Sequence, residues 1–156
     1  MLLLGITSCG GNEQKSYDNV EAMVEAAKAS VEHISPADFK AVMESDKSFY
    51  LIDCREPGEF EVACIRGALS VPRGVLEDEI AIQAPKKRMT VYVYCDNGQR
   101  SALAASILPQ LKYSDVKLID GGFEAWQQAY PELVENAPVR GAVKKTVAAP
   151  SGGCGG

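Results

Sequence analysis

Along most of the chain, short apolar runs alternate with segments in which hydrophobic residues recur at helical spacing. The clearest runs are "FYLIDC" and "MTVYVYC", which are apolar, rich in β-branched and aromatic residues, and bounded by polar turns. Such runs are typical of buried strands. We therefore predict strands over residues 49–54, 68–72, 89–95 and 116–122.

Segments with helical spacing lie between and around these runs. Val20, Met23, Val24, Ala27 and Val31 repeat with helical periodicity, and Asp18 or Asn19 is available as the N-cap. Ser35 followed by Pro36 is typical of a helix start. Further helices are predicted after Pro57 and over residues 74–85, 101–111 and 122–129.

Alternating strands and helices with short connections predict an α/β fold with a mostly parallel sheet covered by helices on both faces. In such sheets the functional site lies beyond the carboxyl ends of the strands. The 156 residues suffice for one core. We divide the chain into a leader and linker (1–16), an amphipathic helix (17–32), the α/β domain (33–137) and a tail (138–156) that is rich in Gly, Ala and Pro.

Charge and residue counts exclude several classes of function. The net charge of −5 leaves no basic surplus for phosphate backbones, so nucleic acid is not an expected partner. The five cysteines include no CxxC pair, and His33 is the one histidine, so neither a metal site nor another cofactor is expected. His33 lies far from Cys95 in the sequence, and we interpret it as a partly buried structural residue.

The first residues, "MLLLGITSC", resemble the end of a bacterial lipoprotein signal, with Ile6, Thr7 and Ser8 before Cys9. The stretch is short and has no preceding Lys or Arg, which departs from that pattern. The hypothesis is that a lipid on Cys9 attaches the protein to a membrane on the periplasmic or outer side of the cell. A cytoplasmic location is the alternative.

The segment "VYVYCDNGQRS" places Cys95 between a predicted strand and a helix expected to start at Ser101, so residues 96–100 would wrap over the thiol. The positive end of the helix dipole and its unpaired N–H groups favour an anion, here a thiolate. Arg100 would add a cation, and Gly98 would permit a backbone conformation that other residues avoid. These features describe a nucleophile that works without histidine.

Three segments together resemble the single-domain rhodaneses, which are sulfurtransferases. "CDNGQRS" matches their six-residue CxxGxR loop followed by Ser or Thr. "LIDCREPGEFEVACIRGALSVP" is similar to the second signature, which has DxR, an acidic-aromatic pair and GHIxGA. "GGFEAW" resembles the Gly-Gly-hydrophobic segment that ends in Trp. Together they extend from Ile34 to Tyr130 in the family's order.

The resemblance implies a three-layer rhodanese-like fold around a five-stranded sheet, and two-step transfer of sulfane sulfur through a persulfide on Cys95. Arg100 and the loop would bind the anionic donor. The donor would be thiosulfate, a polysulfide or a persulfide, and the acceptor would be a thiol or cyanide. The expected loop residues are Asp96, Asn97, Gly98, Gln99 and Ser101. Asp53 and Arg55 would brace the loop, Trp126 would be a core residue, and the protein would act as a monomer.

Two departures from the family pattern concern cysteine and charge. Ala63-Cys64 replaces the usual Gly-His, and we interpret Cys64 as a small buried hydrophobe; a disulfide with Cys54 or Cys95 is the alternative. Asp96 follows the nucleophile and opposes a dianion, so weak thiosulfate turnover is expected. Cys154, in the glycine-rich tail, is a candidate second thiol that would accept or resolve the sulfur.

Two other functions share parts of this pattern. Cys-based phosphatases also place Cys and Arg at a strand–helix junction, but in a loop one residue longer than the one between Cys95 and Arg100. A non-catalytic, membrane-anchored sulfur carrier would keep the same loop. Persulfide formation without ester hydrolysis would exclude the phosphatase.

Overall fold

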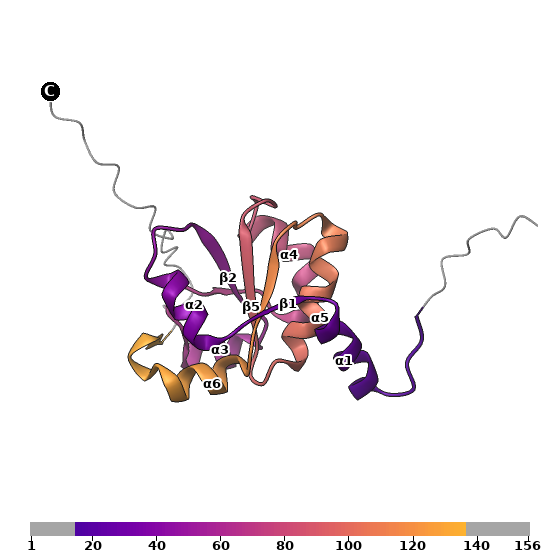
Figure 1. Ribbon diagram of the computed structural model, residues 1–156, viewed down its shortest axis with the longest axis horizontal. Helices are drawn as coiled ribbons and strands as arrows, with labels where there is room; N and C mark the ends of the chain where they lie inside the picture. The colour runs from indigo at the N-terminus through magenta and orange to yellow at the C-terminus, as the bar shows by residue number, and fades with distance from the viewer. Residues whose placement is uncertain (1–14, 137–156) are drawn as a thin grey trace, which may run out of the picture.

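The computed structural model describes residues 15–136, so Cys9 and Cys154 lie outside it. Its centre is a five-stranded sheet in which every pair of neighbouring strands is parallel (Figure 1). In spatial order the strands are β1 (Glu32–Ile34), β6 (Val116–Ile119), β5 (Thr90–Tyr94), β2 (Phe49–Asp53) and β4 (Leu69–Ser70). Parallel pairing brings the carboxyl ends of all five strands to one edge, where the site is expected.

Helices cover both faces of the sheet, as predicted (Figure 1). On one side are α1 (Val20–Ala29), α4 (Leu76–Gln83) and α5 (Gln99–Ile107), with α1 packed against α5. On the other are α2 (Pro36–Met43), α3 (Pro57–Val62) and α6 (Gly122–Ala129). Three short 3-10 turns complete the order: η1 (Arg73–Val75), η2 (Leu108–Leu111) and η3 (Pro131–Leu133).

The alternation of side chains along β5 creates two separate cores. Val91, Val93 and Cys95 face the layer that contains α4 and α5. Tyr92 and Tyr94 face the opposite layer, whose core is mainly aromatic. The aromatic core is built from Phe39, Tyr92, Tyr94, Phe123 and Trp126. Trp126 has no exposed surface, which agrees with its predicted place in the core.

The predicted strands and helices are present, and the elements that the sequence missed are very short. β1 has three residues, none of them buried, so its apolar pattern is too weak to stand out. A second sheet pairs β3 (Cys64–Ile65) with β7 (Val134–Glu135) in antiparallel fashion, and each strand has two residues. Such short strands are set by their partners rather than by their own composition.

His33 connects β1 to the turn that follows β6. Its Nδ1 lies 2.6 Å from Asp120 Oδ1, and its Nε2 lies 3.0 Å from the carbonyl oxygen of Lys28. The hydrogen bonds to Asp120 and to the Lys28 carbonyl raise the pKa of His33 above its ordinary value. The histidine is exposed rather than partly buried as predicted, and its two hydrogen bonds give it a structural role at the edge of the sheet.

We predict that this contact makes stability depend on pH. Since the pKa of His33 is raised in the folded state, its contribution is full below about pH 6.5 and is lost as the pH rises through the folded-state pKa. Both side chains are partly exposed, so the contribution is about 0.2–1 kcal/mol. Urea unfolding of wild type and Asp120→Asn between pH 5.5 and 8.5 should show a larger dependence in wild type, because only the hydrogen bond to the Lys28 carbonyl still raises the pKa of His33 in the variant.

Candidate active site

Cys95 is the first residue beyond β5, at the carboxyl edge of the sheet. The helix after it, α5, begins at Gln99, so the predicted start at Ser101 was two residues late. Gly98 has a φ of 93° and turns the chain, and Asn97 Oδ1 accepts the N–H of Gln99 at 3.2 Å. The loop is therefore only Asp96 to Gly98, and Arg100 lies in the first turn of the helix.

Ser101 contacts the candidate nucleophile directly. Its hydroxyl oxygen lies 3.4 Å from Cys95 Sγ, and both residues are fully buried. The helix N-terminus, with its positive dipole end, lies only a few residues away at Gly98 and Gln99. A hydroxyl donor and a helix dipole both favour a negatively charged sulfur at this position.

The N-terminus of α6 holds the loop backbone. The N–H of Phe123 donates to the carbonyl of Cys95 at 2.7 Å, and the N–H of Glu124 donates to the carbonyl of Asp96 at 3.1 Å. Gly122 makes this approach possible. A Cβ atom there would lie 2.4 Å from the Cys95 carbonyl oxygen and 2.5 Å from that of Asp96.

Asp53 and Arg55 form a buried ion pair beside the site. Arg55 Nη2 donates to Asp53 Oδ2 at 2.7 Å and to the carbonyl of Ala63 at 2.7 Å. Its guanidinium also lies over the ring of Phe123, 4.0 Å from the ring centre. The pair therefore connects the end of β2 to α6 and to the start of β3, which suits the bracing role predicted for it.

Arg100 supplies the predicted cation, and Glu59 of α3 binds it, which the sequence did not suggest. The guanidinium donates through Nη1 and Nη2 to the two carboxylate oxygens at 2.7 and 2.8 Å. These hydrogen bonds lower the pKa of Glu59 to about 2, so the carboxylate is charged at neutral pH. Sequence reasoning missed Glu59 as a site residue, although it belongs to the acidic-aromatic pair of the second signature.

The ion pair with Glu59 changes the electrostatics around Arg100. The carboxylates of Glu59 and Asp96 both raise the pKa of the Arg100 guanidinium. Glu59 does so mainly through its hydrogen bonds, and Asp96 through its charge. Cys95 has no exposed surface beneath them. Glu59, Asp96 and Arg100 together carry a net negative charge.

The other predicted loop residues lie at the surface or support the turn. Asn97 and Gln99 are exposed, whereas Gly98 is buried at the turn. Cys64 is almost fully buried in β3, in agreement with its predicted packing role.

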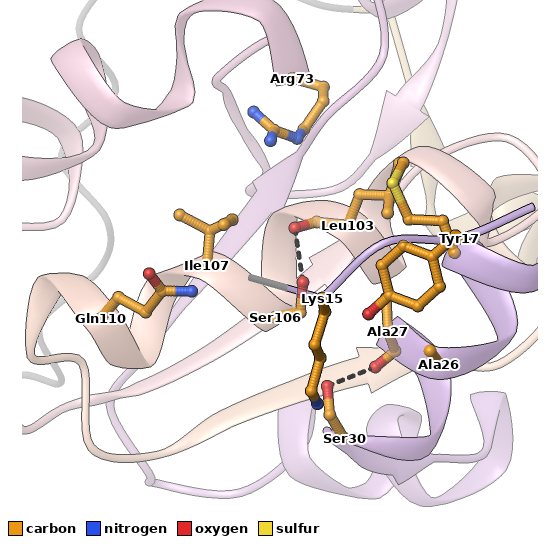
Figure 2. A pocket seen from close by; sticks show the side chains of 11 residues that line it. Lys15, Tyr17, Ala26, Ala27, Ser30, Arg73, Leu103, Ser106, Ile107 and Gln110 are labelled. Atoms are coloured by element: carbon orange, nitrogen blue, oxygen red, sulfur yellow. Dashed lines mark hydrogen bonds between the residues drawn. The ribbon is translucent and has the colours of Figure 1, made fainter. Parts of the chain in front are cut away.

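A separate pocket of about 540 Å³ lies between α1 and α5 (Figure 2). Small residues on α1 leave this space open, and none of the loop residues lines it. Its lining includes Lys15, Tyr17, Met23, Ala26, Ala27, Ser30, Arg73, Leu103, Ser106, Ile107 and Gln110. The hydroxyls of Ser30 and Ser106 donate to carbonyls of their own helices.

Two other features are absent from the part of the chain that the structure describes. Residues 15–136 contain no group of three or more His, Cys, Asp or Glu side chains placed to hold a metal ion. No helix within the same residues has the length and apolar character needed to cross a membrane.

Comparison with known families gives one match that covers most of the chain. The model of the rhodanese-like domain matches residues 35–129. Thiosulfate sulfurtransferase GlpE of Pseudomonas aeruginosa is 32% identical over 103 residues, covering 64% of this chain and 87% of the relative. The "Probable adenylyltransferase/sulfurtransferase MoeZ" of Mycobacterium tuberculosis is 31% identical over 70% of this chain, which spans only 28% of that relative.

Solved structures show the same similarity. A protein of unknown function from Rhodopseudomonas palustris, described as a possible tyrosine phosphatase, has a TM-score of 0.62 and 34% identity, with 76% of this chain and 96% of that chain covered. A thiosulfate sulfurtransferase from Pseudomonas aeruginosa has a TM-score of 0.59 and 32% identity, with 64% of this chain and 19% of that chain covered.

We predict that Gly122→Ala, which adds a single methyl group, markedly lowers the free energy of unfolding. The new Cβ would collide with two loop carbonyls, and the φ of 60° is unfavourable for alanine. The free energy of unfolding should fall by about 2–4 kcal/mol. Gly58→Ala is the matched control, because nothing lies within 4 Å of its Cβ position, and it should change stability by less than about 1 kcal/mol. Urea denaturation measures both, and equal effects would contradict the prediction.

Proposed function

Because the chain belongs to the rhodanese family, we propose that it transfers sulfane sulfur through a persulfide on Cys95. Sulfurtransferase activity in general is supported by relatives such as the thiosulfate sulfurtransferase GlpE of Pseudomonas aeruginosa. The observation that carries the assignment to Cys95 is its position between β5 and α5, with the Ser101 hydroxyl 3.4 Å from the sulfur.

The proposed reaction has two steps. The Cys95 thiolate attacks the outer sulfur of the donor, and the donor leaves with the electron pair of the broken bond. For thiosulfate the leaving group is sulfite; for a polysulfide it is the shortened chain. An external thiolate or cyanide then attacks the outer sulfur of the persulfide, and Cys95 leaves as a thiolate. Ser101 and the N-terminus of α5 would stabilise the anionic sulfur in both forms.

The net negative charge of Glu59, Asp96 and Arg100 favours a donor with little negative charge. Glu59 already binds the guanidinium of Arg100, and Asp96 adds a second carboxylate beside it. A dianion such as thiosulfate must approach both, which costs binding energy. Low-molecular-weight persulfides, and polysulfides in the hydropolysulfide form with one negative charge, are therefore the proposed donors, and a thiol is the proposed acceptor.

A phosphatase is the second candidate, because one similar structure is described as a possible tyrosine phosphatase. Two observations favour sulfur. Four residues separate Cys95 from Arg100, one fewer than in the loop of Cys-based phosphatases. Arg100 is also bound at both terminal nitrogens by Glu59, so it is less available to a phosphate dianion. Turnover of p-nitrophenyl phosphate without persulfide formation would support the phosphatase.

Attachment to a membrane through a lipid on Cys9 is the proposed location, on the strength of the sequence Ile6-Thr7-Ser8-Cys9. Under this proposal the domain faces the periplasm or the cell exterior. Metabolic labelling with palmitate should modify wild type and not Cys9→Ala.

We predict that treatment with polysulfide adds sulfur to Cys95. Intact-mass spectrometry of samples quenched with acid directly after mixing should detect adducts in multiples of about 32 Da, the mass of one sulfur atom. Cys95→Ser should gain no adduct at this position, because the nucleophile is absent. An adduct of equal yield in the variant would show that another thiol carries the sulfur.

We predict that Asp96→Ser raises activity with thiosulfate. Removing one carboxylate near the dianion should increase kcat/KM for thiosulfate about 3- to 10-fold at low ionic strength, with a smaller gain at high salt. Asp78→Asn, in the first turn of α4, is the control with the same change in net charge. Equal gains in both variants would attribute the effect to net charge rather than to the position of Asp96.

A further inference from the structure

A second thiol lies next to the candidate nucleophile on the neighbouring strand. β2 and β5 are parallel and in register, with Asp53 opposite Tyr94 at their ends. The ladder continues one residue further, where the N–H of Cys54 donates to the carbonyl of Tyr94 at 2.8 Å. Cys54 and Cys95 are therefore the next pair beyond the two strands.

The two side chains also share one face of the sheet. Ile52 and Val93 precede them by two residues, and all four belong to the same buried core cluster on the side of α4 and α5. Both cysteines are fully buried. Adjacent strands lie about 4.8 Å apart, within the 4.4–6.8 Å range of Cα separations that disulfides span.

We propose that Cys54 is a resolving thiol, which displaces the sulfur from a persulfide on Cys95 and releases it as hydrosulfide. This proposal rests on the sulfur-transfer function proposed above. The Cys54 sulfur attacks Cys95 Sγ, a Cys54–Cys95 bond forms, and the bond between Cys95 Sγ and the outer sulfur breaks. The outer sulfur leaves with the bonding electrons as hydrosulfide and takes the proton of the Cys54 thiol.

The electrons balance without an added oxidant. The sulfane sulfur is reduced to hydrosulfide, and the two cysteines are oxidised to a disulfide. A dithiol reductant, through thiol–disulfide exchange, then returns both cysteines to the thiol form. In the absence of an external acceptor, the protein would release one hydrosulfide per chain and stop until it is reduced.

The surroundings of Cys54 make this reaction slower than transfer to a reactive external thiol. Burial raises the pKa of the Cys54 thiol well above its ordinary value, and the negative charges of Cys95 and Asp53 raise it further. Arg73 and Arg100 act in the opposite direction. Since little thiolate is present near neutral pH, an external acceptor can take the sulfur before Cys54 does.

The test compares reduced wild type with Cys54→Ala, loaded with sodium tetrasulfide and quickly desalted. Wild type should lose about 2 Da relative to the reduced protein and release one equivalent of hydrosulfide. Non-reducing digestion should then yield the peptide pair joined through Cys54 and Cys95. Cys54→Ala should instead keep an adduct of about 32 Da, with a persulfide lifetime at least about tenfold longer.

Control variants distinguish a failure of the proposed role of Cys54 from a failure of the proposed sulfur transfer. Cys54→Ser provides a second variant of similar size, and circular dichroism checks that both fold. Cys64→Ser, which removes another buried cysteine, should behave as wild type. If Cys64→Ser keeps the adduct, Cys64 is the resolving thiol and the proposal fails. A stable adduct in wild type, without hydrosulfide, overturns the role of Cys54 but leaves sulfur transfer intact. If the two Cys54 variants give neither an adduct nor hydrosulfide, sulfur transfer itself is overturned, and the role of Cys54 with it. Hydrosulfide without an adduct in these variants shows that another thiol, such as Cys154, resolves the persulfide, and overturns the role of Cys54 alone.

Discussion

The hydrogen bond between the N–H of Phe123 and the carbonyl of Cys95 is the contact on which the arrangement of the site depends. It joins the end of the central strand β5 to the start of α6, two segments far apart in the sequence. With the bond from Glu124 to Asp96, it sets the direction in which the short loop leaves the strand. The close approach requires Gly122, since any side chain there would displace the loop.

Charge pairing then determines what the loop can bind. The site contains two pairs of opposite charge, Asp53 with Arg55 and Glu59 with Arg100. The first pair is buried and connects three elements, whereas the second is partly exposed. Because Glu59 neutralises Arg100, the positive end of α5 and the Ser101 hydroxyl remain as the groups that favour an anionic sulfur. This arrangement is the basis of the proposal that the donor carries less negative charge than a dianion.

The strand periodicity gives the site its second thiol. Side chains alternate between the two cores along β2 and β5, so residues in register face the same layer. Cys54 and Cys95 consequently enter one buried cluster, beside each other and shielded from solvent. The tyrosine that precedes Cys95 faces the aromatic core instead, where its hydroxyl accepts the N–H of Ile65. β5 thus separates the layer that holds the two cysteines from the aromatic core.

The sequence by itself determined the strands at 49–54 and 89–95, the helices around them and the Cys95–Arg100 motif, because these depend on local periodicity and on residues close in the chain. It did not reveal β1, whose three residues become a strand through pairing with β6. It placed the start of α5 two residues late, because the turn depends on the conformation of Gly98. Only the tertiary structure brought Glu59 to Arg100 and Cys54 to Cys95. Both contacts join residues 41 positions apart, so they arise from strand register and helix packing and leave no local pattern in the sequence.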